Sequence, residues 1–262
     1  MENVDAIERA DLRGVVVRDV DLRGARFERV KLRGAVMRGM DLGQVRIDGD
    51  IEGLVINGVE VEAPVSAELD RRYPDRVKMR PTDVPGFREA WDVVERLWDG
   101  TDERARKLPP ELLHESVDGE WSFIQTLRHL AFATDAWICR VILGDPAPWH
   151  PLDLPFDEMS ETPGVPWDRD VRPSLEDVLQ LRRDRMAVVR RYVDDLTEDA
   201  LNADTTPVPG PGWPPPDNYS IREILLLLLN EEWQHRLYAE RDLATLESTQ
   251  YLVADHNLRD PS

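Results

Sequence analysis

The N-terminal part of the chain places an apolar residue at every fifth position. One apolar column runs from residue 12 to residue 47, and a second runs two residues ahead of it. The first column is Leu12, Val17, Leu22, Phe27, Leu32, Met37, Leu42 and Ile47, and the second is Ala10, Val15, Val20, Ala25, Val30, Ala35, Met40 and Val45. Neither a helix nor a strand keeps a period of five on one face. The spacing therefore predicts an internal repeat.

Helical periodicity begins after a stretch that is rich in proline and charge. Residues 61–87 have the composition of a linker, and apolar residues at helical spacing predict a helix over about 87–97. Three later helix starts are marked by a serine followed three residues on by Gln, Asp or Glu, a capping pattern, at Ser122, Ser174 and Ser220. The corresponding helices are predicted over about 122–143, 174–196 and 220–244. Helices of these lengths predict a four-helix bundle.

Two long connections interrupt the bundle. Residues 144–173 hold seven prolines and residues 207–216 hold six, so neither segment can be a regular helix. Loops of this length commonly serve as lids or binding loops. Their tryptophans, Trp149, Trp167 and Trp213, either cover an apolar site or pin the loops to the bundle, and the sequence leaves both open.

Charge and cysteine content narrow the functional classes. The 52 acids and 33 bases give a net charge of −19, which disfavours binding to nucleic acid or to an anionic membrane surface. The single cysteine, Cys139, excludes an internal disulfide and multi-cysteine zinc sites. No apolar run reaches the length of a membrane span. We therefore expect a cytoplasmic protein whose partners include neither nucleic acid nor membrane.

The helix over 220–244 places an acid and an imidazole on its apolar face. With Ile221 at zero and about 100° per residue, Glu231 falls near 280° and His235 near 320°, beside Leu228 near 340°. Burying an unpaired carboxylate costs several kcal/mol, so a compensating cation is expected. The i, i+4 spacing lets Glu231 and His235 bind one metal ion.

A second pattern competes with this interpretation. Glu232 also lies within the apolar arc and forms Glu-x-x-His with His235, and Glu111 with His114 repeats that spacing. Paired Glu-x-x-His motifs are typical of di-iron bundles. The di-iron alternative is weaker because Glu111 follows two prolines, in a segment that resembles a short turn.

His129, on the helix over 122–143, is the candidate third ligand. It lies near 240° on a wheel whose apolar stripe is near zero. A histidine off the main stripe is commonly an ordinary surface side chain. On the residues alone, its role as a ligand stays open.

The five-residue repeat resembles the pentapeptide-repeat family, as in Ala10-Asp11-Leu12-Arg13-Gly14 and Ala25-Arg26-Phe27-Glu28-Arg29. The resemblance implies a right-handed quadrilateral β-helix over residues 1–63, with the central apolar residue pointing inward. Some members of that family are acidic mimics of DNA. Residues 1–65 contain 13 acids and 10 bases, which disfavours mimicry and favours a structural or interaction module.

Residues 86–245 resemble the DinB/YfiT-like four-helix superfamily, which includes mycothiol-dependent S-transferases and maleylpyruvate isomerases. The matching stretches are Glu120-Trp121-Ser122-Phe123, Thr126-Leu127-Arg128-His129-Leu130 and Asn230-Glu231-Glu232-Trp233-Gln234-His235-Arg236-Leu237-Tyr238-Ala239-Glu240-Arg241-Asp242-Leu243. The resemblance implies that His129, Glu231 and His235 bind one divalent metal ion, zinc before nickel. The fold class is then α+β with two domains: the β-helix, a linker over 64–85, the bundle, and a C-terminal tail over 246–262.

The resemblance also implies a reaction. Three protein ligands leave an open metal position, which suits activation of a thiol. We expect a metal-dependent S-transferase that uses a low-molecular-weight thiol of the mycothiol type on a small electrophile, with Tyr238 and His150 as candidates for positioning the substrate. Cys139 is expected to be a buried apolar side chain. The alternative is a non-enzymatic, stress-associated metalloprotein whose bundle forms a homodimer and whose β-helix binds a partner.

Overall fold

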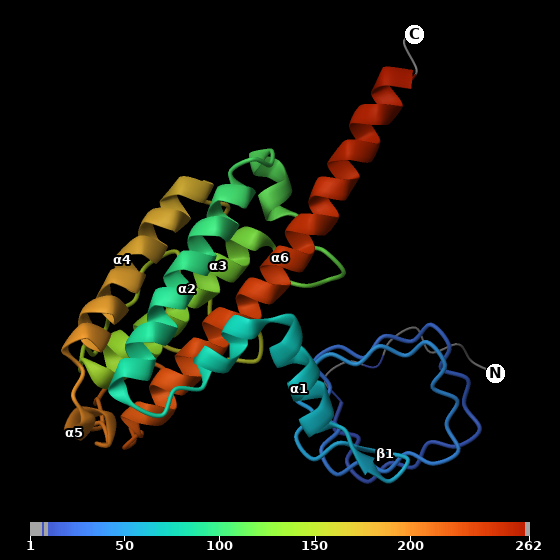
Figure 1. Cartoon of the computed structure of the whole chain (residues 1–262), viewed down its shortest axis with the longest axis horizontal. Coiled ribbons are helices and arrows are strands. Elements are labelled where there is room, and N and C mark those ends of the chain that lie inside the picture. Colours follow the sequence, from blue (N-terminus) through green and yellow to red (C-terminus); the bar gives the residue numbers. More distant parts are fainter. Residues whose placement is uncertain (1–6, 8–9, 260–262) are drawn as a thin grey trace. The chain divides into compact units, whose positions relative to one another are not determined.

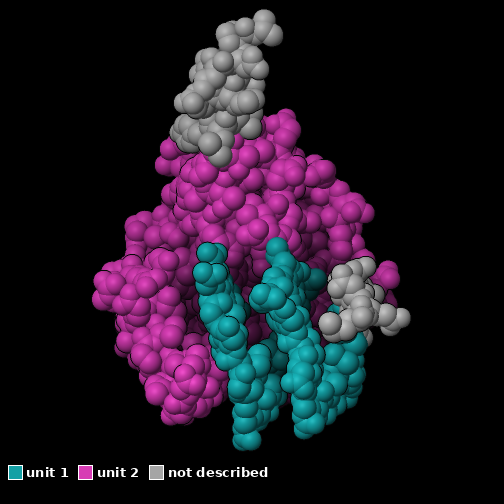
Figure 2. All heavy atoms as spheres, turned by 90° about the vertical axis from the view of Figure 1, so that its right-hand side faces the viewer, with its two compact units in different colours: residues 1–50 teal, residues 51–262 magenta. Residues whose placement is uncertain are grey.

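The computed structural model describes residue 7 and residues 10–259, with the backbone alone from residue 250 onward. The chain divides into two compact units, Met1–Asp50 and Ile51–Ser262, which Figure 2 shows in different colours. Each unit is described by itself below.

The first unit winds as a series of coils (Figure 1). Hydrogen-bonded turns recur in it at ten-residue intervals. At four turns a backbone N–H donates to the carbonyl three residues earlier, over 2.9 to 3.2 Å, from Val15, Ala25, Ala35 and Val45. Gly14, Gly24 and Gly34 hold φ values of 77° to 79° at three of these turns, where a side chain would be strained. The repeat spacing in the sequence thus sets the spacing of the turns.

The predicted quadrilateral β-helix is not confirmed. Within residues 10–50 the structure assigns no strand, and the backbone hydrogen bonds that it shows there close turns within single coils. The central apolar residue of each repeat was expected to point inward, yet Leu12 is 50% exposed and Phe27 is 63% exposed. Figure 2 shows the coils as separate layers of atoms. Without a ladder of hydrogen bonds between coils, the columns are not enclosed.

The second unit begins with a small hairpin and is otherwise helical. Strands β1 (Val55–Ile56) and β2 (Val59–Glu60) pair antiparallel. The helical elements are α1 (Glu62–Arg72), the 3-10 helix η1 (Pro74–Met79), α2 (Val84–Ala105), the 3-10 helix η2 (Pro110–His114), α3 (Phe123–Thr134), the π-helix η3 (Asp135–Ile142), α4 (Leu175–Asp195), α5 (Glu198–Leu201) and α6 (Ile221–Arg259). None of the described helices has the length and apolar character needed to cross a membrane.

Three differences from the sequence-based expectations concern element limits. The stretch 64–85, expected to be a linker, carries most of α1 and all of η1. The helix expected over 122–143 is α-helical only to Thr134 and continues as a π-helix. Helix α6 continues to Arg259, although a tail was expected from residue 246.

The serine caps form at the predicted positions. At α3 the Ser122 hydroxyl accepts from the Gln125 N–H at 3.3 Å, and the Gln125 side chain accepts from the Ser122 N–H at 3.0 Å, which completes a capping box. The Ser174 hydroxyl accepts from a backbone N–H at the start of α4 over 3.2 Å. Ser220 does the same for α6 over 3.4 Å. The caps at Ser122 and Ser220 fix the first turns of α3 and α6, the helices that carry His129, Glu231 and His235.

Helices α2, α3, α4 and α6 pack around a common apolar core (Figure 1). Helix α3 is buried on all sides, because every residue of it except Gln125 is buried. The proline-rich loops cover its outer face, where a second apolar cluster forms around Phe132. Members or neighbours of that cluster include Met159, Val165, Trp149, Trp167 and Trp213. The loop tryptophans therefore pin the loops to the bundle.

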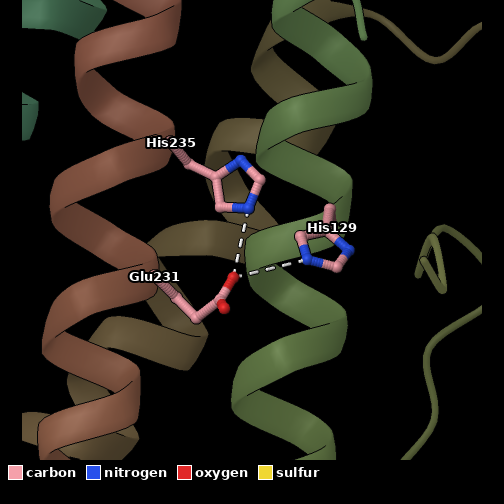
Figure 3. Close-up of side chains that lie close together, drawn as sticks. All are labelled: His129, Glu231 and His235. Carbon is pink, nitrogen blue, oxygen red and sulfur yellow. Dashed lines mark hydrogen bonds and ion pairs between the residues drawn. The ribbon is translucent and has the colours of Figure 1, made fainter. Parts of the chain in front are cut away.

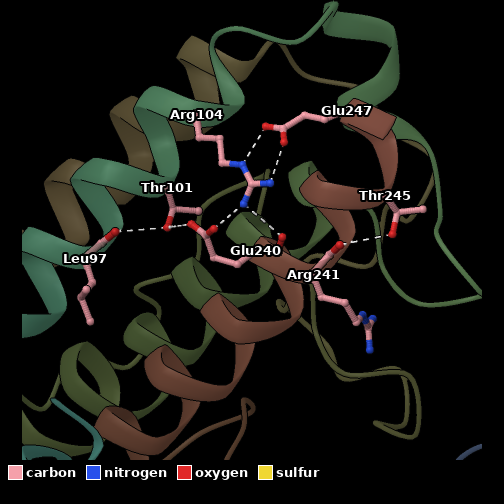
Figure 4. A network of polar contacts seen from close by, with 7 residues as sticks. All are labelled: Leu97, Thr101, Arg104, Glu240, Arg241, Thr245 and Glu247. Atoms are coloured by element: carbon pink, nitrogen blue, oxygen red, sulfur yellow. Dashed lines mark hydrogen bonds and ion pairs between the residues drawn. The ribbon is translucent and has the colours of Figure 1, made fainter. Parts of the chain in front are cut away.

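Polar contacts hold α6 in register against α2 (Figure 4). The Arg104 guanidinium donates to both carboxylate oxygens of Glu247 at 2.7 Å, and it also contacts Glu240. The Thr101 hydroxyl lies 2.6 Å from a Glu240 carboxylate oxygen. These contacts hold the part of α6 that follows His235 against α2.

Candidate metal centre

His129, Glu231 and His235 converge between α3 and α6 (Figure 3). Glu231 Oε2 lies 3.1 Å from His235 Nε2 and 3.6 Å from His129 Nε2. The ligand atoms of a tetrahedral zinc ion, with bonds of about 2.1 Å, lie about 3.4 Å apart. All three potential ligand atoms here lie within 4.8 Å of one another, and they form the one such His, Cys, Asp or Glu group found among the described residues.

The helices explain this convergence. Glu231 and His235 lie one turn apart on α6, so both side chains leave the same face. His129 lies on α3, which packs directly against α6. The structure thus brings together the three residues that the resemblance selected.

The tautomer of His129 is set by a backbone contact. Its Nδ1 lies 3.0 Å from the carbonyl oxygen of Leu154, and a carbonyl can only accept, so Nδ1 carries the hydrogen. The Nε2 electron pair then points toward Glu231. Metal-binding histidines commonly have their second ring nitrogen held in this way.

The electrostatics leave a position for a cation. Burial lowers the pKa of His129, mainly through desolvation, so the ring is neutral near pH 7. Burial alone would raise the pKa of Glu231, but interactions with the two histidines outweigh it and bring that pKa below its ordinary value. With the hydrogen of His129 on Nδ1, only His235 of the two rings can donate a hydrogen bond to this carboxylate. An ionised carboxylate and a neutral imidazole, two acceptors, therefore face each other. These are the protonation states that metal ligands require.

Two aromatic side chains border the group. The Trp121 ring lies 4.5 Å from the His129 ring and is stacked at 5.9 Å on the His235 ring, centroid to centroid. Tyr238, a predicted positioning residue, presents its ring 6.3 Å from that of His235 and lies beneath Arg241. Trp121 was not predicted as a site residue. Its signals in the sequence are its place in a stretch that resembles the DinB/YfiT-like superfamily and its position directly before the Ser122 cap.

The additional residues of the di-iron alternative either pair with another side chain or lie outside the group. Arg182 Nη2 donates to both carboxylate oxygens of Glu232, at 3.0 and 2.7 Å, and both side chains are buried. Glu111 and His114 lie on the short η2 and are not part of the group. The geometry therefore does not support the di-iron alternative.

His150 and Cys139 lie outside the group. The Nδ1 atom of His150, a predicted positioning residue, accepts from the Leu152 N–H at 3.1 Å, and burial lowers the pKa of the ring. Cys139 is half-buried, and burial, aided by the neighbouring Asp135, raises the pKa of its thiol to about 12. A thiol with that pKa is not a nucleophile at neutral pH.

Comparison with known protein families agrees with this architecture. A model of the DinB superfamily matches residues 94–239, and eight copies of the pentapeptide repeat match residues 8–49. No curated protein and no solved structure shows a significant match to the chain. The DinB match spans more than half of the chain and contains all three converging residues. The chain therefore belongs to the DinB superfamily and carries pentapeptide repeats ahead of its DinB domain.

Proposed function

We propose that this protein binds one divalent metal ion through His129, Glu231 and His235, and that it uses the ion to activate a low-molecular-weight thiol of the mycothiol type. The observation that carries the proposal is the meeting of an ionised carboxylate with the electron pair of a neutral imidazole, within reach of one ion. Two imidazoles and one carboxylate favour zinc, with nickel as the second choice.

The exposure of the three side chains supports a catalytic rather than a structural role. The His129 side chain is 9% exposed, whereas those of His235 and Glu231 are 19% and 31% exposed. The two ligands on α6 are therefore the ones that solvent reaches most. Three protein ligands leave a coordination position open, and a bound divalent cation supplies the positive charge that favours a thiolate over a thiol at neutral pH.

The protein's own residues would orient the reaction. Leu154 holds the His129 ring in one tautomer, and the Trp121 ring covers one side of both imidazoles. Tyr238 lies where it can contact a substrate. In the transfer, a sulfur–carbon bond forms as the bond from that carbon to the leaving group breaks, and the thiol proton passes to solvent.

Elemental analysis of three proteins tests the metal site. The wild type should contain about one divalent ion per chain, His235→Ala should lose it, and His114→Ala should keep it because His114 lies on η2, outside the group. Equal metal content in the wild type and His235→Ala would remove the proposed site.

A cobalt titration tests the thiol chemistry separately. The visible spectrum of the Co²⁺-loaded wild type should change when a small thiol is added, because a sulfur ligand alters the cobalt transitions. If Co²⁺ binds but the spectrum ignores mycothiol and simpler thiols alike, the S-transferase proposal is wrong. The non-enzymatic metalloprotein would then be the better description.

A further inference from the structure

Behind His129 lies a buried pair of carboxyl groups that the proposed reaction does not use. Asp135 is the first residue of the π-helix η3, and Asp153 lies in the loop that leads to Leu154. Both residues are 0% exposed, and their carboxyl groups face each other closely enough that each shifts the pKa of the other. Because ionised carboxylates are acceptors only, such a contact requires one shared proton.

The neighbours of the pair indicate which group holds the proton. Arg185 contacts both oxygens of Asp135, with Nε at 2.6 Å from Oδ1 and Nη2 at 2.8 Å from Oδ2. Asp153 accepts the His150 N–H at 2.9 Å through Oδ2, whereas its Oδ1 is buried and receives no N–H or O–H from the described residues. Burial and the neighbouring Asp135 charge raise the pKa of Asp153 well above its ordinary value. Asp135 is therefore the carboxylate and Asp153 the acid.

The loop that carries Asp153 also carries the acceptor for His129. The Leu154 N–H donates to the Arg128 carbonyl at 3.3 Å, and Arg128 Nε donates to the Leu152 carbonyl at 2.7 Å. One residue after Asp153, the Leu154 carbonyl accepts from His129 Nδ1 at 3.0 Å. The Asp153 side chain thus ties the loop to η3 next to the atom that selects the tautomer of a candidate ligand.

We propose that Asp153 is a positioning residue for the metal centre: it shares its proton with Asp135 and thereby holds the Leu154 carbonyl against His129 Nδ1. The ring then presents Nε2 as the metal-binding atom. The chain of contacts runs from Arg185 through Asp135, Asp153 and Leu154 to His129. The relevance of these contacts to metal binding rests on the proposed function, whereas their effect on the tautomer of His129 does not.

Two substitutions separate the shared proton from simple space filling. Asp153→Asn keeps both contacts, because its amide N–H can donate to Asp135 and its oxygen can accept from the His150 N–H. Asp153→Ala loses both. Asp157→Ala is the matched control: it removes another aspartate of the same connection, one that pairs with Arg169 at 2.7 Å.

The first readout is the tautomer of His129 in the metal-free full-length protein, from the ¹⁵N shifts of its ring. Wild type, Asp153→Asn and Asp157→Ala should show the Nδ1–H form, and Asp153→Ala should show a mixture of both neutral forms. The second readout is Co²⁺ affinity, which should fall about 10- to 100-fold in Asp153→Ala and stay unchanged in Asp153→Asn.

The outcomes distinguish the two proposals. An unchanged Nδ1–H form in Asp153→Ala, or its loss in Asp153→Asn, overturns the inference whatever the metal does. If Asp153→Ala does not fold, Asp153→Asn still decides, since the inference requires it to keep the wild-type tautomer. If the tautomers behave as expected but no variant binds Co²⁺, the metal-binding proposal fails and the positioning of His129 stands.

Discussion

Replacing Arg182 by methionine should strongly destabilise the helical unit, because it leaves the Glu232 carboxylate buried and uncompensated. The Arg182 side chain is 3% exposed and that of Glu232 is 0% exposed, and two hydrogen bonds of 2.7 and 3.0 Å join them. Breaking a buried ion pair by removing one partner costs about 3 to 5 kcal/mol. Because the two side chains are almost completely buried, solvent does not screen their interaction, and the full cost is expected. Methionine retains most of the packing against Trp98, whose ring lies 5.6 Å from the Arg182 guanidinium carbon.

A double-mutant cycle separates the charge from the packing. Arg182→Met and Glu232→Met should each lower the free energy of unfolding by about 3 to 5 kcal/mol, while the double variant should cost far less than their sum. Urea unfolding of metal-free protein, followed by far-UV circular dichroism, measures this. Metal is removed so that an ion bound to Glu231, the residue next to Glu232 on α6, does not contribute to the measured stability.

An exposed ion pair between the C-cap residue of α2 and helix α4 is the control. Arg106 and Glu176 lie 3.0 Å apart but their side chains are 41% and 63% exposed, so Arg106→Met should hardly change the unfolding midpoint. The reasoning is refuted if Arg182→Met behaves like this control. Strict additivity in the double variant would equally refute it, because the two changes would then act independently.

Three other outcomes are expected. Burial raises the pKa of Asp102 to about 6, so the contribution of this group to stability should fall as the pH rises from about 4 to 6. Asp102→Asn should therefore lose stability less steeply than the wild type over this range, and be more stable at pH 7 by about 1 to 3 kcal/mol in urea titrations. The raised pKa of the Cys139 thiol should make its alkylation by iodoacetamide at pH 8 more than about a hundredfold slower than that of a free cysteine. Binding of Ni²⁺ should quench the fluorescence of Trp121, whose ring lies 4.5 Å from that of His129, and Trp121→Phe should remove the largest part of the quenching.

The sequence predicted what depends on local signals. The Ser122 cap with Gln125 is a short-range pattern, and the predicted capping box forms. The i, i+4 spacing of Glu231 and His235 requires only a helix, and α6 supplies it. The five-residue period predicted regular turns, which appear at ten-residue intervals in the first unit.

Features that depend on distant segments were harder to predict. The helical wheel placed His129 off the apolar stripe, yet His129 is 7% exposed, because the loop that follows η3 covers this side of α3. The Leu154 carbonyl, 25 residues further along the chain, provides its partner. The assignment of Glu232 to Arg182 rather than to a metal ion likewise depends on α4, 50 residues away. A wheel drawn for a single helix contains neither contact.

Glu231 and Glu232 show why the metal centre should also govern stability. The two carboxylates are neighbours on α6, and Glu232 is neutralised within the protein by Arg182. Glu231 faces one imidazole that burial keeps neutral, so its charge is compensated only in part. A cation bound there completes the compensation in the folded state and has no equivalent site in the unfolded chain. Metal at about 100 times its Kd should therefore stabilise the protein by about 2.7 kcal/mol, and Glu231→Gln, which removes the charge, should be less destabilising in metal-free protein than in metal-loaded protein.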